Sequence, residues 1–166
     1  MLTSCDQLQS ILRHADELPG PLRPLGAQAA AAARQLLASI DHSDREIAAL
    51  ARNLEPGEEA RLSAKIAALA PGPDSGAEHP PMRALMEKQL ELIGGLSGQV
   101  EEARHDRNRH VEMLKTLALH VASLRARSAE TPTEVRSLSD RVRALCDEIG
   151  HQSQALAEES ATKTHR

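Results

Sequence analysis

The chain has 166 residues, with 20 basic and 24 acidic side chains and no Phe, Tyr or Trp. The missing aromatic rings count against base-stacking surfaces for single-stranded nucleic acid and against cages for methylated amines. A formal net charge of −4 lacks the basic field of a DNA-binding domain. With 23 Leu and 27 Ala, the composition is typical of helical bundles and coiled coils, whose narrow interfaces are filled by aliphatic side chains.

Two further properties bear on the location of the protein. No segment approaches the roughly 18 consecutive apolar residues of a transmembrane helix, so we expect no membrane span. The two cysteines, Cys5 and Cys146, lie near opposite ends of the sequence and suit reduced thiols better than a disulfide framework. Cys5 falls on the apolar face of the first predicted helix. These features predict a cytoplasmic protein.

Proline and glycine divide the N-terminal part of the chain. Apolar periodicity and helix breakers predict helices at about 3–18, 27–54 and 57–70. Residues 19–26 are expected to form a linker between the first two helices. The alanine run 29–33 is compatible with a close-packing surface, but we expect a helical stretch with little packing specificity.

The Pro- and Gly-rich segment 71–81 cannot continue a helix. We interpret it as a linker between an N-terminal helical unit, residues 1–70, and a second unit, residues 82–157. The apolar pattern is lost after residue 157, which predicts a frayed tail at 158–166.

The second unit is predicted to be a hairpin of two long helices, at about 82–128 and 132–157. One heptad frame holds throughout the longer helix, and the short loop between the two favours antiparallel neighbours. Thr131-Pro132-Thr133-Glu134 is typical of a helix start. The expected interaction seam consists of Ile93, Leu96, Val100, Leu114, Leu117, Val121, Leu124, Val135, Leu138, Val142, Leu145 and Ile149. The predicted fold class is all-α, an elongated helical bundle or antiparallel coiled-coil hairpin with about five helices.

The first half of the longer helix needs another partner, because the shorter helix is long enough to cover only the second half. Either the N-terminal helices or a second chain would meet this need, and the sequence leaves both open. Gly94, Gly95 and Gly98 weaken the helix in this half. They predict either a hinge or a close approach of another backbone.

A polar segment, residues 101–110, interrupts the apolar seam. Its histidines, His105 and His110, are five residues apart and diverge by about 140° around a helix, so they cannot chelate one ion together. We expect a solvated, salt-bridged helix face without a metal or another cofactor. Arg107 and His110 nonetheless fall at core heptad positions, where a polar residue fixes register or partner choice. A buried His110 would make an assembly pH-sensitive.

The sequence contains no nucleotide-binding loop, nucleophile elbow or paired-cysteine metal motif. We therefore expect no enzymatic activity and no small-molecule substrate. The leading hypothesis is a non-catalytic scaffold that assembles through its helical seams with a protein partner or with itself, as a homodimer. Binding of nucleic acid is disfavoured.

One part of the second unit resembles a known class of segments. The stretches VEMLKTLALHVASLRA, residues 111–126, and VRALCDEI, residues 142–149, are similar to helical segments appended to bacterial serine/threonine protein kinases. The motifs of the kinase domain itself are absent from the sequence. The resemblance of residues 111–149 implies an alternative function, a regulatory or sensor segment beside such a kinase, and it assigns no site residues.

Overall fold

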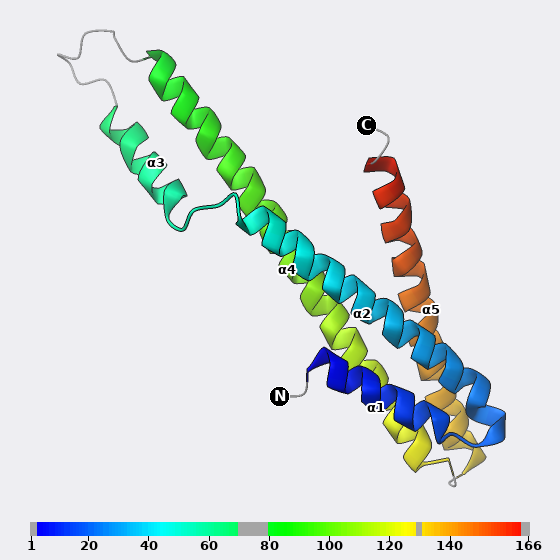
Figure 1. Ribbon diagram of the computed structural model, residues 1–166. Coiled ribbons are helices and arrows are strands. Elements are labelled where there is room, and N and C mark those ends of the chain that lie inside the picture. Colours follow the sequence, from blue (N-terminus) through cyan, green and yellow to red (C-terminus); the bar gives the residue numbers. More distant parts are fainter. Residues whose placement is uncertain (1–2, 70–79, 129–130, 164–166) are drawn as a thin grey trace. The chain divides into compact units, whose positions relative to one another are not determined.

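A computed structural model describes residues 3–69, 80–128 and 131–163, with the side chains of the last helix described up to Ala155. Within these ranges the chain forms five α-helices and no strand, which confirms the all-α fold class. In chain order the elements are α1 (Ser4–Asp16), a 3-10 turn (Gly20–Leu22), α2 (Arg23–Ala51), α3 (Glu58–Ala68), α4 (Pro80–Ala126) and α5 (Pro132–Lys163) (Figure 1).

Contacts between residues group the chain into two compact units. Unit 1 consists of Met1–His42 and Arg107–Arg166, and unit 2 of Ser43–Asp106. This grouping differs from the expected division at residues 71–81, because α2 and α4 are long enough to supply residues to both units. Most of that expected linker, residues 71–79, lies outside the described residues, and α4 already begins at Pro80.

The first helix, α1, begins with a capping box. The side-chain oxygen of Thr3 accepts a hydrogen bond from the Asp6 backbone N–H (3.2 Å), and the Asp6 carboxylate accepts one from the Thr3 backbone N–H (2.8 Å). The two bonds satisfy donors that a helix terminus otherwise leaves open. The backbone and hydroxyl of Thr3 both donate to the Asp6 carboxylate and hold its pKa below the ordinary value.

The second helix, α2, begins at Arg23, four residues earlier than predicted. Pro24 lies in its first turn, where the missing N–H costs no hydrogen bond. Gly26 is therefore helical and does not belong to a linker. A Cβ on Gly26 would lie 2.9 Å from the carbonyl oxygen of Ala15 and 3.1 Å from a methyl group of Leu18. The backbones of α1 and α2 thus approach each other closely at this glycine.

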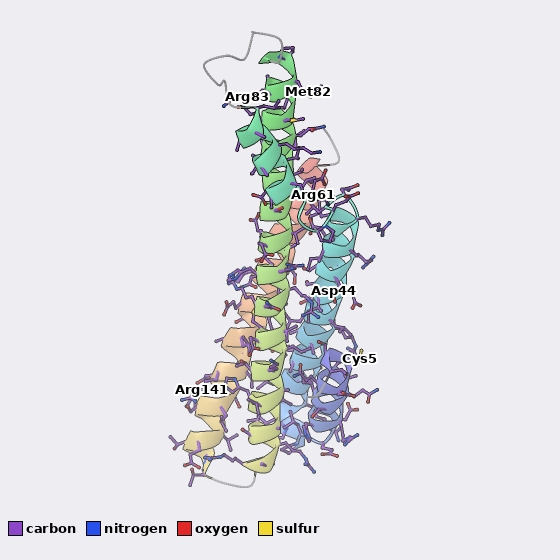
Figure 2. The ribbon with its side chains drawn as sticks, turned by 90° about the vertical axis from the view of Figure 1, so that its left-hand side faces the viewer. Cys5, Asp44, Arg61, Met82, Arg83 and Arg141 are labelled. Atoms are coloured by element: carbon purple, nitrogen blue, oxygen red, sulfur yellow. The ribbon has the colours of Figure 1, made fainter. Side chains whose placement is uncertain are left out.

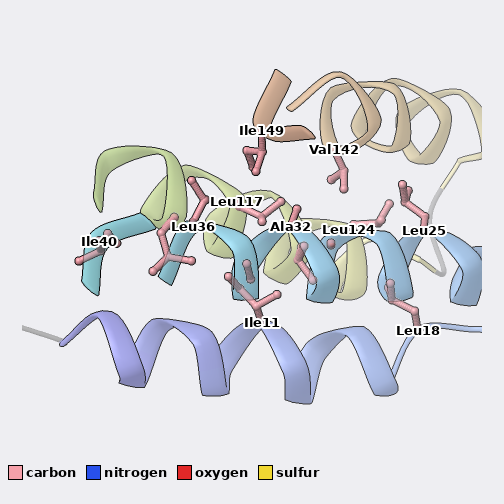
Figure 3. Close-up of a cluster of buried hydrophobic side chains, with 14 residues drawn as sticks. Ile11, Leu18, Leu25, Ala32, Leu36, Ile40, Leu117, Leu124, Val142 and Ile149 are labelled. Carbon is pink, nitrogen blue, oxygen red and sulfur yellow. The ribbon is translucent and has the colours of Figure 1, made fainter. Parts of the chain in front are cut away.

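Unit 1 is organised around buried apolar side chains from α1, α2, α4 and α5 (Figure 3). The cluster consists of Ile11, Leu18, Leu25, Ala29, Ala32, Ala33, Leu36, Ile40, Leu114, Leu117, Val121, Leu124, Val142 and Ile149. Full burial of a Leu, Ile or Val side chain stabilises a fold by about 1.5–3 kcal/mol. The alanine run contributes to this core, so it forms a close-packing surface, contrary to the expectation of a stretch with little specificity.

Ion pairs between α4 and α5 give the direction of these two helices within unit 1. Arg127 lies 3.9 Å from Glu134, and Arg109 lies 3.7 Å from Glu148. The C-terminal end of α4 thus lies beside the start of α5, and an earlier part of α4 lies beside a later part of α5. The two helices are therefore antiparallel here. α5 begins at Pro132, as predicted, and continues to Lys163 into the expected tail.

In unit 2, a tight corner precedes α3. Gly57 has a φ of 77°, in the left-handed region that favours glycine. The Arg61 guanidinium donates to the Glu55 carboxylate (3.2 Å) and to the Pro56 carbonyl oxygen (3.3 Å), which ties the first turn of α3 to the corner (Figure 2). The helix spans slightly less than the predicted 57–70, and its Leu62 is buried.

The long helix α4 continues without interruption through its three glycines. A Cβ on Gly94, Gly95 or Gly98 would meet no atom of the described residues within 4 Å. The alternative of a close backbone approach is therefore not realised among the described residues. In the described ranges, we find no helix with the length and apolar character needed to cross a bilayer.

The contact at Gly26 predicts that Gly26→Ala destabilises the protein. The new methyl group would lie too close to the carbonyl oxygen of Ala15, and this backbone atom cannot move without shifting α1. We expect a loss of about 1–3 kcal/mol in the free energy of unfolding, measured by denaturant titration followed by circular dichroism.

Gly98→Ala is the matched control. Its methyl group would enter open space in a helix interior, where Ala is favoured over Gly by about 1 kcal/mol. Equal effects of the two substitutions would contradict the close approach of α1 and α2 at Gly26.

Candidate functional site

The C-terminal part of the predicted seam lies inside unit 1. Leu114, Leu117, Val121, Leu124 and Val142 are all 0 % exposed, and Ile149 is 1 % exposed. Val135, Leu138 and Leu145 are partly buried and pack against this core. Since the chain's own helices cover these side chains, a second chain would reach them only if the bundle opened.

The N-terminal part of the seam belongs to unit 2 and has a different environment. Val100 is buried, whereas Ile93 and Leu96 are half-buried. Three large apolar side chains near them are mostly exposed: Met82 at 50 %, Leu85 at 55 % and Leu92 at 61 %. This half of α4 therefore keeps apolar surface in contact with water.

The exposed Met82, Leu85 and Leu92 and the half-buried Met86 and Ile93 share one side of α4. At 100° per residue, Met82, Leu85, Met86, Leu92 and Ile93 lie within a sector of about 120°, and we call this surface the α4 strip. Met82 projects from the first turn of α4 (Figure 2). The strip itself carries no charge, and its neighbours Arg83 and Glu87 form an ion pair of 2.8 Å along the helix.

The strip differs from a single exposed leucine because several of its apolar side chains are exposed side by side. Among the described residues, Leu119 in unit 1 is the other large apolar side chain that is mostly exposed, at 69 %. Single exposed apolar residues are common on folded proteins, whereas contiguous patches mark binding surfaces. Leu119 is therefore a suitable control for the strip.

The polar segment 101–110 holds local ion pairs. Arg104 donates to Glu101 at 2.6 Å, and Arg109 lies 3.7 Å from Glu148. His105 is exposed. The part of the chain that the structure describes contains no group of three or more His, Cys, Asp or Glu side chains arranged to hold a metal ion.

Two residues of this segment fall at core positions of the heptad frame. His110 is 7 % exposed and Arg107 is half-buried. Both side chains engage in polar or charged interactions. They place polar groups at core positions of α4, which is the arrangement that the register hypothesis requires.

Two further buried polar side chains gave no signal in the sequence. Gln7 is 8 % exposed, and among the described residues its side-chain oxygen finds no hydrogen-bond donor. Ser139 is 8 % exposed and donates a hydrogen bond to the Val135 carbonyl oxygen (2.8 Å) on its own helix. Both lie on helix faces that pack into unit 1.

The two thiols differ in environment. Cys5 is exposed, contrary to its expected place on the apolar face of α1, because Gln7, Ile11 and Ala15 form the buried face instead. Cys146 packs against the core of unit 1. Burial, together with the negative charge of Asp147, raises the pKa of the Cys146 thiol from 9.0 to about 11.

Comparisons with known proteins give no relative: no protein-family model, no curated protein and no solved structure matches this chain. These comparisons do not test the similarity of residues 111–126 and 142–149 to kinase-appended helices, and both stretches supply core residues of unit 1. The candidate site therefore depends on the geometry of this chain alone.

The buried position of His110 predicts a pH-dependent stability. Between about pH 5 and 8 an imidazole gains or loses a charge, and inside a folded chain this change acts on the packing around it. We expect the melting temperature to vary over this range, and His110→Leu to remove most of the variation. His105→Leu, at an exposed position of the same segment, should leave the variation intact. An unchanged profile in the His110 variant would refute the hypothesis.

The raised pKa of Cys146 predicts a slow reaction of this thiol. At pH 8 its thiolate fraction is on the order of a hundredfold below that of an ordinary thiol. With Ellman's reagent, we expect Cys5→Ser, which retains Cys146, to react far more slowly than Cys146→Ser, which retains Cys5.

The same pKa has a consequence for folding in alkali. Between about pH 9 and 11 the folded chain retains a proton that an ordinary thiol loses. Stability should therefore fall as the pH rises through this range, and Cys146→Ser should reduce that fall. Equal reaction rates of the two thiols, with equal alkaline melting profiles, would contradict the described environment of Cys146.

Proposed function

We propose that this protein is a non-catalytic helical interaction protein that binds a protein partner through the α4 strip. The observation that carries the proposal is the exposure of Met82, Leu85 and Leu92, each at least half accessible to water, within eleven residues of one helix. Apolar side chains exposed in this way lower their free energy when a partner covers them.

The chemistry of the strip favours a helical partner. Its apolar residues follow the spacing of three, four and seven by which one helix packs against another. The middle of a protein interface is typically poor in charge and surrounded by a polar rim. Arg83 and Lys88 flank the strip, one on each side, and would form such a rim.

The two units then have different roles in the proposed function. The buried side chains of unit 1 give the chain a core of its own, so its seam residues stabilise the fold. Unit 2 carries the accessible apolar surface. The proposed binding surface therefore leaves out Leu114, Leu117 and Val121 of the expected seam and lies on the first half of α4.

Site-specific photo-crosslinking in the cells that make the protein tests the proposal. The photoreactive residue p-benzoylphenylalanine replaces Leu85, Leu92 or, as the control, Leu119 in separate versions of the full chain. We expect discrete protein adducts from positions 85 and 92, because a partner covers them, and none from position 119. All three positions were chosen for their exposure, so the replacements should not disturb the core.

Two results would contradict the proposed function. In the first, positions 85 and 92 give no adduct, which means that the strip faces water in the cell. In the second, all three positions give the same adducts, which means that the contacts are unspecific. A specific adduct also yields the mass of the partner.

A further inference from the structure

We infer that unit 2 opens as a separate step while unit 1 stays folded. The long helix α4 then combines a stably folded second half with a first half that unfolds and refolds in the native protein. Unit 2 opens in this way whether or not a partner binds the α4 strip, so the inference goes beyond the proposed function. The burial, the short α3 helix, the charge and the glycines of unit 2 all support it.

The two units bury very different amounts of apolar side chain. The core cluster of unit 1 contains 14 residues, and none of them belongs to residues 43–106. Among the described residues of unit 2, the buried apolar side chains are Leu62, Val100 and Ala103, at 9 %, 4 % and 8 % exposure. Burial of apolar surface is the main favourable contribution to folding. Unit 1 is therefore held together much more strongly than unit 2.

The α3 helix cannot make up this difference. Figure 1 and Figure 2 both show α3 beside the first half of α4 in unit 2. It has 11 residues, its N-cap residue Gly57 provides no side-chain hydrogen bond, and its one buried side chain is Leu62. An isolated helix shorter than about 12–15 residues is marginal in water. We therefore expect α3 to be lost whenever the first half of α4 unfolds.

The charge of unit 2 acts in the same direction. Residues 43–106 carry 12 acidic and 7 basic side chains, whereas the rest of the chain carries 12 acidic and 13 basic side chains. An excess of one sign repels itself in a compact structure, and the repulsion weakens when the chain expands. Opening therefore relieves repulsion in unit 2, and unit 1 has almost no net charge to gain from it.

The glycines of α4 lie in the half that has the smaller core. Gly94, Gly95 and Gly98 belong to unit 2, and residues 107–126 of the same helix contain no glycine. Glycine loses more backbone freedom on folding than any other residue. A Cβ at these three positions would meet no atom of the described residues within 4 Å, so no close packing offsets this cost.

The opening has a defined end along α4. The helix passes from unit 2 to unit 1 between Asp106 and Arg107, within the polar segment 101–110. When the first half unfolds, the helix shortens toward this point, and unit 1 keeps every residue of its core cluster. Native proteins open in such cooperative units, each with its own free energy.

Hydrogen exchange of the full chain, followed by mass spectrometry of peptic fragments, tests the inference. The protection of an amide reports the equilibrium constant of the opening that exposes it. We expect the amides of residues 84–104 to be protected at least about 100-fold less than those of residues 114–124. The amides of α3, residues 62–68, should be no better protected than residues 84–104.

A variant with Gly94→Ala and Gly98→Ala tests the role of the glycines. Both new methyl groups enter open space and favour the helix. We expect the exchange of residues 84–104 to slow by roughly 10- to 30-fold, with no change in residues 114–124. Gly150→Ala is the matched control, because its methyl group also enters open space but lies in α5 of unit 1. It should leave the exchange of residues 84–104 unchanged.

Three results would overturn the inference. Equal protection of residues 84–104 and 114–124 would show that the two halves of α4 open together. An equal slowing of exchange in both halves by Gly94→Ala with Gly98→Ala would show the same. No slowing in either half would mean that residues 84–104 exchange without loss of the helix that carries the glycines.

Discussion

The close contact between Gly26 and the carbonyl oxygen of Ala15 sets the spacing on which the rest of unit 1 depends. A chain without aromatic rings has no large side chain with which to fill a wide gap between helices. Its helices must therefore approach closely, and this requires small residues at the point of contact. Ala29 and Ala33, both 0 % exposed, continue the same side of α2 beyond Gly26. Once the backbones are close, Leu, Ile and Val from α1, α4 and α5 are large enough to complete the core.

The heptad pattern predicts the buried faces of α5 and of the second half of α4, but it does not predict what covers them. Leu117 and Val142 occupy core positions because of their spacing, and the structure buries both. The same spacing would serve a seam between two chains, since intramolecular and intermolecular burial place the same demand on a helix face. Whether a face is covered depends on residues distant in sequence, here Ile11 and Leu36, and no local pattern in α4 indicates them.

The errors in predicting the N-terminal helices also have a physical explanation. Pro24 and Gly26 are helix breakers in most contexts, so they predicted a linker. Pro24 is tolerated because the first turn lacks partners for its N–H groups anyway. Gly26 is tolerated because the close approach of Ala15 excludes any side chain there. The general rule fails at these two positions because tertiary contacts and position within the helix outweigh the intrinsic propensity.

The three glycines of α4 lower the stability of the helix that carries the strip. Gly94, Gly95 and Gly98 each reduce helix stability by about 1 kcal/mol relative to Ala, and the heptad frame places them on faces away from the strip. An isolated helix with this composition is only marginally stable in water, so it stays folded only when other parts of a protein pack against it. A partner that buries Leu85 and Leu92 would supply part of that packing. Binding at the strip should thereby stabilise the helix as well as the complex, because a ligand that binds only the ordered form favours that form.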